Sequence, residues 1–231
     1  MELYKVTMNV IGEVLYSLPV KSTQPLEKPR GLHRELRRLV KGESGIIDGE
    51  KLQNFVFPTD NYDIFISHSH DDLEIAKQFA AWLKEKYEYS VFLDSFVWNS
   101  ADGLLQEIDN LYCKQRNGLY NYRKRNYSTA HIHTMLSMSI MEIIKNSSAG
   151  IFINSPHSIN LRNLSNNNRA KTLSPWIYQE IMFMRQFANK TPSTRMFSCE
   201  NLNEGLQIAR TVDLSDFTPL TARDLIGKAL L

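Results

Sequence analysis

Trp176 and Glu180 are the residues of this chain whose types and spacing best suit chemistry. They are four residues apart near the start of a predicted helix, so they would be neighbours on one helical face. Ile177, Ile181 and Met184 occupy the adjacent stripe, which we expect to face the core. A carboxylate beside an indole suits a ligand with an aromatic part and a sugar part. The spacing also allows a structural interpretation, in which Trp176 packs and Glu180 is solvated or pairs with a lysine.

A polar loop at residues 67–72, with the sequence SHSHDD, is the second candidate. It directly follows the apolar run at 63–66, which is typical of a buried strand. In open α/β sheets the ligand binds beyond the carboxyl ends of the strands, so this loop would border a ligand crevice. His68 and His70 would either act on the ligand or hydrogen-bond the loop backbone.

The elements that must position these residues form a strand-helix-strand unit. Asp71 and Glu74 have the spacing of a capping box, and apolar residues then recur at helical spacing to about Tyr87. The run at 91–94 is the next strand, and a unit of this length predicts a parallel, right-handed crossover.

Further helices and strands follow. We expect a helix at 101–111, a loop or hairpin at 114–127, a helix from 129, a strand at 149–153 and a loop at 160–168. A helix at 176–188 follows, with Ser174 as its N-cap and Pro175 at the first helical position. An edge strand at 208–214 and a helix at 221–230 complete the chain. The pattern predicts one α/β domain at 61–231 with an insert near 112–128, preceded by an N-terminal extension at 1–60.

Composition excludes several classes of protein. The chain has 231 residues, 42% of them hydrophobic, and a formal net charge of +2, which is too small to favour nucleic-acid binding. No apolar run approaches the ~20 residues that a membrane span needs. Two cysteines make no disulfide framework and the N-terminus lacks a signal-peptide pattern, so we expect a cytoplasmic protein. The basic stretch at 28–41 predicts a short surface helix, either solvated or bound to an acidic partner or membrane surface.

Two other chemistries are disfavoured. His131 and His133 would point to different faces of a helix, and no nearby Cys or acidic ligand completes a metal site, so they would line the pocket or cap the helix start. A Ser-His-Asp hydrolase built on the 67–72 loop lacks the Gly-x-Ser-x-Gly turn that exposes a nucleophilic serine.

Three segments, in this order, together resemble a TIR domain: DIFISH at 63–68, VFLD at 91–94 and SPWIYQEI at 174–181. The resemblance covers residues 62–230. The segments DSFVW at 94–98, NYSTAHIH at 126–133 and NSP at 154–156 further resemble stand-alone bacterial TIR proteins of anti-phage defence, of the Thoeris type. The resemblance implies a flavodoxin-like, doubly wound parallel sheet.

The resemblance also implies an activity. Enzymatic TIR domains cleave NAD+, and the catalytic glutamate of their Trp-x-x-x-Glu helix maps onto Glu180, with Trp176 as its companion. The substrate would lie over the loop after the first strand and beside the aspartate that ends the second. The substrate-binding residues implied in this way are Phe65, Ser67, His68, Asp94, Trp98 and Trp176.

One carboxylate is sufficient for this reaction, because nicotinamide leaves NAD+ as a neutral, stable molecule. Neither a metal nor a cofactor is required. Attack by water would give ADP-ribose, attack by an atom of the same molecule a cyclic form, and attack by an amine or imidazole a conjugate; the sequence leaves these products open.

The partners implied are NAD+, other copies of the TIR domain through residues 95–100, a phage-derived trigger and a separate effector switched on by a signal nucleotide. The alternative is a TIR adaptor without catalytic activity that acts through assembly, because a fold does not establish an activity.

Overall fold

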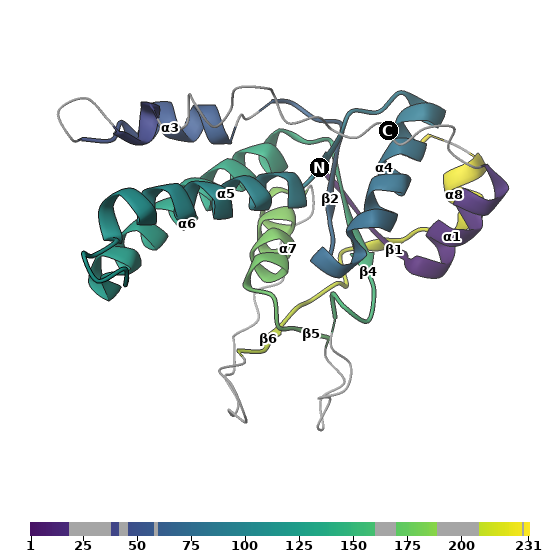
Figure 1. The fold of residues 1–231 in the computed structure, drawn as a ribbon. Coiled ribbons are helices and arrows are strands. Elements are labelled where there is room, and N and C mark those ends of the chain that lie inside the picture. Colours follow the sequence, from purple (N-terminus) through teal and green to yellow (C-terminus); the bar gives the residue numbers. More distant parts are fainter. Residues whose placement is uncertain (19–37, 42–45, 58–59, 160–169, 189–207, 228) are drawn as a thin grey trace. The chain divides into compact units, whose positions relative to one another are not determined.

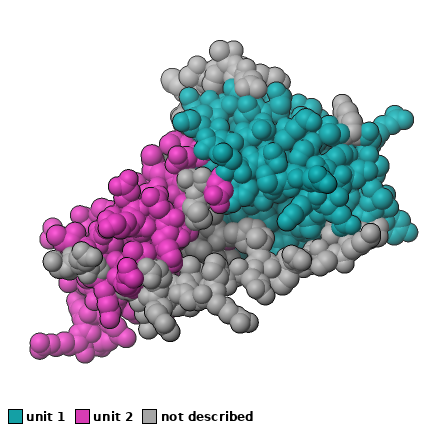
Figure 2. Space-filling view, turned by 90° about the horizontal axis from the view of Figure 1, so that it is seen from above, with its two compact units in different colours: residues 1–23, 61–94, 143–231 teal, residues 24–60, 95–142 magenta. Residues whose placement is uncertain are grey.

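The computed structural model describes residues 1–18, 38–41, 46–57, 60–159, 170–188, 208–227 and 229–231, with two compact units. Unit 1 contains residues 1–23, 61–94 and 143–231, and unit 2 contains residues 24–60 and 95–142 (Figure 2). The predicted loop at 160–168 lies outside the described residues. So does most of the predicted basic helix, of which residues 38–41 are described and helical.

A parallel sheet of five strands forms the centre of unit 1, in the order β3-β2-β4-β1-β7. The strands are β1 (Glu2–Thr7), β2 (Ile64–Ser67), β3 (Val91–Leu93), β4 (Ala149–Asn154) and β7 (Thr218–Pro219). Every residue of β2 and the first five of β4 are buried. Continuous apolar runs of this kind are typical of strands covered on both faces.

Helices cover both faces of this sheet (Figure 1). One face carries α1 (Met8–Ser17), α4 (Leu73–Tyr87) and α8 (Ala222–Gly227), with α1 in contact with the other two. The opposite face carries α7 (Pro175–Phe187), which contacts β2. The apolar stripe of α4 includes Ala76, Phe79 and Leu83, all buried, and the helix ends before Glu88 in a left-handed conformation.

The architecture confirms the α/β class and is consistent with the expected flavodoxin-like arrangement. β3, the next strand along the chain, pairs with one edge of β2, whereas β4 pairs with the opposite edge of β2. The direction of winding therefore reverses between β2 and β4. Such a switch point opens a crevice at the carboxyl ends of the strands.

The first strand differs from the expectation of an N-terminal extension over residues 1–60. β1 pairs with β4 along all six of its residues and with β7 on its other side. Leu3 and Val6 are 5% and 1% exposed. Their apolar side chains complete the core, and the backbone of β1 supplies hydrogen bonds that the edge of β4 would otherwise lack. Residues 24–60 of the expected extension belong to unit 2.

Several element boundaries also differ. α5 (Ser95–Ile108) begins earlier than expected and continues into a π-helical turn at Asp109–Cys113. α6 (Tyr122–Asn146) takes up part of the expected 114–127 loop, which narrows to a turn closed by pairing of Lys114 with Tyr120. The expected edge strand at 208–214 is β6 (Arg210–Thr211), which pairs antiparallel with β5 (Lys171–Thr172) in a separate sheet.

The capping box expected at Asp71 and Glu74 does not form. A 3-10 turn at His70–Asp72 precedes α4, and Asp72, the N-cap residue, makes no side-chain capping bond. Its carboxylate is buried and bonded elsewhere, as described below.

Unit 2 is helical in its described part. It holds α3 (Gly49–Val56), α5, the π-helical turn and α6 as far as Glu142. Asp48 caps α3 by accepting a hydrogen bond from the backbone N–H of Lys51. The Tyr112 hydroxyl donates to the carbonyl of Val40 at 2.8 Å. Throughout the described residues, no helix has the length and apolarity to cross a membrane.

The position of β1 predicts that Val6→Ala destabilises the protein. Val6 is 1% exposed, so removal of its methyl groups should lower the free energy of unfolding by about 2 kcal/mol. Tyr16, on α1, is 91% exposed, and Tyr16→Ala should change stability by less than about 0.5 kcal/mol. Urea denaturation measures both. Equal, small effects would show that β1 is a dispensable extension.

Candidate active site

The carboxyl ends of three neighbouring strands bring polar residues to one edge of the sheet. Ser67 ends β2, Asp94 follows β3 and Ser155 follows β4. All three are buried, with exposed fractions of 0%, 4% and 4%. Because the strands are parallel, their carboxyl ends meet at the same edge, and the pair β2-β4 marks the switch point.

Glu180 enters this edge from α7. The helix begins as expected, with Ser174 accepting a hydrogen bond from the backbone N–H of Ile177 and Pro175 at the first position. Ile177, Ile181 and Met184 are buried and fix the rotation of the helix. Glu180 lies on this buried side and is 1% exposed, which excludes the interpretation of a solvated carboxylate.

Ser67 holds the carboxylate of Glu180. Its hydroxyl donates a hydrogen bond to Oε2 at 2.6 Å, between two side chains that are both buried. A hydrogen bond to a charged group in a buried setting contributes about 1.5–3 kcal/mol. The bond joins residues 113 positions apart in the sequence. It therefore fixes one carboxylate oxygen of α7 at the end of β2.

Trp176 stands one turn before Glu180 on α7 and is half-buried. The helical spacing expected from the sequence is therefore present, with an indole and a carboxylate on neighbouring positions of one helix.

His68 and Asp94 form a second buried pair. Nδ1 of His68 lies 2.8 Å from Oδ1 of Asp94, and the side chains are 0% and 6% exposed. The contact is a close ion pair without the alignment of a well-directed hydrogen bond, and Nε2 has no hydrogen-bond partner among the described residues. Burial is the largest single influence and lowers the pKa of His68, but the interactions with Asp94, together with the Ile66 backbone and the charge of Asp72, outweigh it, so the pKa is raised overall. The pair ties the end of β2 to the end of β3.

A third cluster surrounds Asp72, which is 2% exposed. Ser155 Oγ donates a short hydrogen bond to Oδ2 of Asp72, and Nδ1 of His157 lies 2.7 Å from Oδ1. His157 itself is accessible, with 54% of its side chain exposed. Its hydrogen bond to Asp72, then the charge of Asp72, raise its pKa against the opposing effect of desolvation.

The turn after β4 presents His157. Ser155 Oγ accepts hydrogen bonds from the backbone N–H groups of His157 and Ser158, each at 3.1 Å. Ser158 Oγ accepts in turn from the backbone N–H of Ser155 at 2.9 Å. These reciprocal bonds fix the backbone, so the imidazole projects from a rigid turn.

The sequence interpretation missed Ser155 and His157. The loop after β4 follows a buried parallel strand, as the loop after β2 does, so it also borders the crevice at the carboxyl ends of the strands. Polar residues directly after the apolar run at 149–153, among them Ser155, His157 and Ser158, are the signal that identifies this loop in the sequence.

One of the predicted residues, Phe65, lies in the core of unit 1. Phe65 is 0% exposed and packs against Phe92 with ring centroids 5.8 Å apart, so it supports the sheet from within the core. Trp98 belongs to α5 in unit 2, and its side chain lies outside the described part of the structure. His131 and His133 lie on α6, also in unit 2. Within the described ranges, no three His, Cys, Asp or Glu residues are grouped so as to hold a metal.

The site thus combines a buried carboxylate held by a serine, a buried imidazole-carboxylate pair and an accessible imidazole oriented by a buried aspartate. The carboxylates could stabilise positive charge that develops on a substrate in the transition state, and the accessible imidazole could accept or donate one proton. Comparisons with known proteins add no further assignment, since no protein family, no curated protein and no solved structure matches this chain.

The His157–Asp72 contact predicts a pH-dependent effect of His157→Gln. A raised folded-state pKa means that the contact stabilises the protein fully below the ordinary histidine pKa of 6.5 and loses this effect as the pH rises through the folded value. The variant should therefore lose more stability relative to the unsubstituted protein at about pH 6 than at about pH 9.

Urea denaturation across this pH range measures the difference. His70→Gln serves as the control, because His70 is exposed in the same region of unit 1. A loss for His157→Gln that is constant with pH, or that grows toward high pH, would contradict the assignment.

Proposed function

We propose that this chain is an NAD+ glycohydrolase or cyclase that breaks the bond between nicotinamide and ribose. The observation that carries the proposal is the burial of Glu180 at the carboxyl edge of the sheet, with its Oε2 fixed by Ser67 at 2.6 Å. The choice of NAD+ rests on the resemblance of the segments at 63–68, 91–94 and 174–181 to enzymatic TIR domains.

The chemistry follows from the charge of the substrate. As the glycosidic C–N bond breaks, its electron pair stays on the nicotinamide nitrogen, and nicotinamide leaves as a neutral molecule. Positive charge then develops on the ribose. A carboxylate held in a water-poor setting stabilises this charge more strongly than one in bulk water. Glu180 performs this role, and Ser67 acts as a positioning residue that fixes the carboxylate.

Other groups of the site complete the proposal. The indole of Trp176 would stack near the nicotinamide ring. The His68–Asp94 pair would border the same substrate at the ends of β2 and β3. His157 is suited to accept the proton of an attacking hydroxyl, because Asp72 binds its Nδ1 and more than half of its side chain is exposed.

The attacking group decides the product. Attack by water yields ADP-ribose, and one proton of the water passes to the base. Attack by an atom of the substrate itself yields a cyclic nucleotide, and attack by an amine or imidazole yields a conjugate. We propose that the product is an ADP-ribose-type signal in bacterial anti-phage defence, acting on a separate effector. A phage-derived trigger and assembly of several copies belong to the same proposal.

Replacement of the carboxylate tests the assignment. Glu180→Gln keeps the size of the side chain and its ability to bond Ser67, but removes the negative charge. We expect NAD+ consumption to fall by about 100-fold or more, with the melting temperature kept within a few degrees. Glu74→Gln is the matched control, since Glu74 is exposed on α4 of the same unit and should leave activity unchanged.

The assay follows nicotinamide release by the purified protein, with and without phage lysate as trigger, and mass spectrometry identifies the other product. Undiminished consumption by Glu180→Gln would remove Glu180 from the mechanism. A folded, unsubstituted protein that is inactive even with the trigger would favour the adaptor that acts through assembly.

A further inference from the structure

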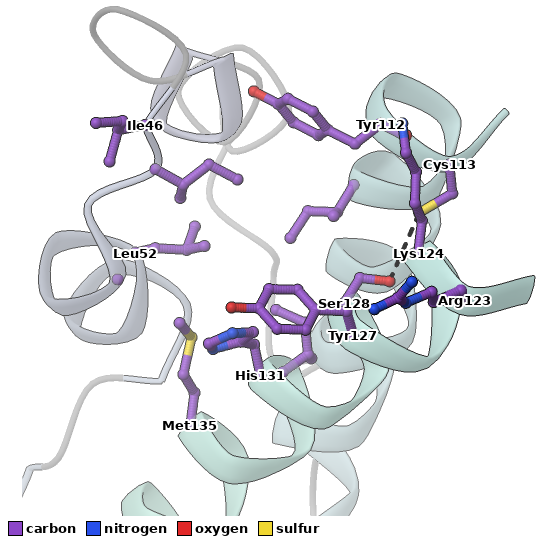
Figure 3. Close-up of a pocket in the computed structure, with 14 residues that line it drawn as sticks. Ile46, Leu52, Tyr112, Cys113, Arg123, Lys124, Tyr127, Ser128, His131 and Met135 are labelled. Atoms are coloured by element: carbon purple, nitrogen blue, oxygen red, sulfur yellow. Dashed lines mark hydrogen bonds between the residues drawn. The ribbon is translucent and has the colours of Figure 1, made fainter. Parts of the chain in front are cut away.

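A cavity in unit 2 is lined by apolar, aromatic and basic side chains and shares no residue with the site around Glu180. Its volume is about 800 Å³. It lies between α3, the π-helical turn and α6, as Figure 3 shows. We call this cavity the α3-α6 pocket. It is lined by Ile46, Ile47, Gly49, Leu52, Ile108, Tyr112, Cys113, Arg123, Lys124, Tyr127, Ser128, His131, Ile132 and Met135.

The inner wall of the α3-α6 pocket is apolar. Leu52, Ile108 and Ile132, which are 1%, 6% and 1% exposed, contribute aliphatic side chains to this wall. Met135 adds a flexible thioether at one end, next to Gly49. A cavity of this size with such a wall is in the range that binds small organic molecules. The wall would take the apolar body of a ligand.

Aromatic side chains border the same space. Tyr127 and His131 are one turn apart on α6, with ring centroids 4.6 Å apart and planes near perpendicular. Tyr127 is nevertheless 70% exposed, so a flat ligand would cover apolar surface that water now contacts. Tyr112 is held in place on the other side by its hydrogen bond to the carbonyl of Val40.

The charges that line the pocket have one sign. Arg123 and Lys124 come from the first turn of α6, and the lining contains neither Asp nor Glu. Lys124 donates to the carbonyl of Tyr112 at 3.2 Å, which keeps its ammonium at the pocket. The positive end of the α6 dipole adds to this field.

The carboxylate behind the pocket wall does not cancel these charges. Asp109 is 5% exposed, pairs with Arg125 at 2.7 Å and accepts a hydrogen bond from Ser128 at 2.7 Å. Its charge is thus compensated by Arg125, which is not part of the lining. Arg123 and Lys124 remain as net positive charge at an apolar cavity.

We propose that the α3-α6 pocket binds a small organic anion with a flat, apolar body and a single carboxylate or phosphate head. The body lies against Leu52, Ile108 and Ile132 and under the rings of Tyr127 and His131. The head group pairs with Arg123 and Lys124. This binding is independent of the function proposed for Glu180.

Four probes that share one body and differ in their head group test this proposal by isothermal titration calorimetry on the full chain. They are 2-naphthoate, 2-naphthyl phosphate, the neutral 2-naphthalenemethanol and the cationic 2-naphthylmethylammonium. Both anions should bind about tenfold more tightly than the neutral probe, and the cation most weakly. The order of the two anions separates a carboxylate ligand from a phosphate ligand.

Two variants locate the binding. Arg123→Glu should weaken both anions about tenfold and leave the neutral probe unchanged. Arg116→Glu makes the same change of charge at an exposed residue of unit 2 outside the lining, and should have no effect beyond about twofold. Met135→Trp fills the cavity and should weaken all four probes, with circular dichroism to verify the fold.

The proposal is overturned if no anion binds saturably, if the neutral and anionic probes bind equally, or if Arg116→Glu weakens the anions as much as Arg123→Glu does. Binding that survives Met135→Trp in a folded variant would place the probes elsewhere on the chain and overturn it as well.

Discussion

Burial of the Glu180 carboxylate is the constraint on which the candidate site depends. A charged group in the interior is costly unless it is hydrogen-bonded, and here a hydroxyl at the end of β2 is the bonded partner. That bond requires α7 to lie on β2 with a fixed rotation, which the buried Ile177 and Ile181 provide. The same helix carries Trp176, so packing of an apolar stripe sets the position of both residues that suit chemistry.

The parallel sheet supplies the rest of the arrangement. Because β2, β3 and β4 run in one direction, the loops after them share an edge, and each contributes a polar group that another loop satisfies. Asp94 pairs with His68, and Asp72 binds Ser155 and His157. These contacts cross between loops, so the polar residues stabilise the edge that they also shape for a ligand. His157 differs from the other members of these pairs, because its Nδ1 contacts Asp72 while 54% of its side chain is exposed.

The two compact units carry different kinds of candidate site. Unit 1 carries the buried carboxylates at the strand ends, whereas unit 2 carries an aliphatic cavity lined by basic residues. The difference follows from their construction: a sheet edge gathers loops and polar ends, while packed helices leave cavities between apolar stripes. The α6 helix serves both, because its last residues, 143–146, belong to unit 1.

Local patterns in the sequence determined the strands at 64–67, 91–93 and 149–154, the end of α4 at Tyr87, the cap of α7 and the neighbouring positions of Trp176 and Glu180. Tertiary structure decided which strands pair and which side chains bond each other. β1 enters the sheet beside β4, with Glu2 paired to Ala149, a residue 147 positions further along the chain, and no local pattern states which strand is the neighbour of β4. Asp72 occupies the N-cap position of α4 but makes no capping hydrogen bond, because its carboxylate is bonded to Ser155 and His157 from the loop after β4. Pairings over such separations depend on the whole packed sheet, which a short window of sequence does not contain.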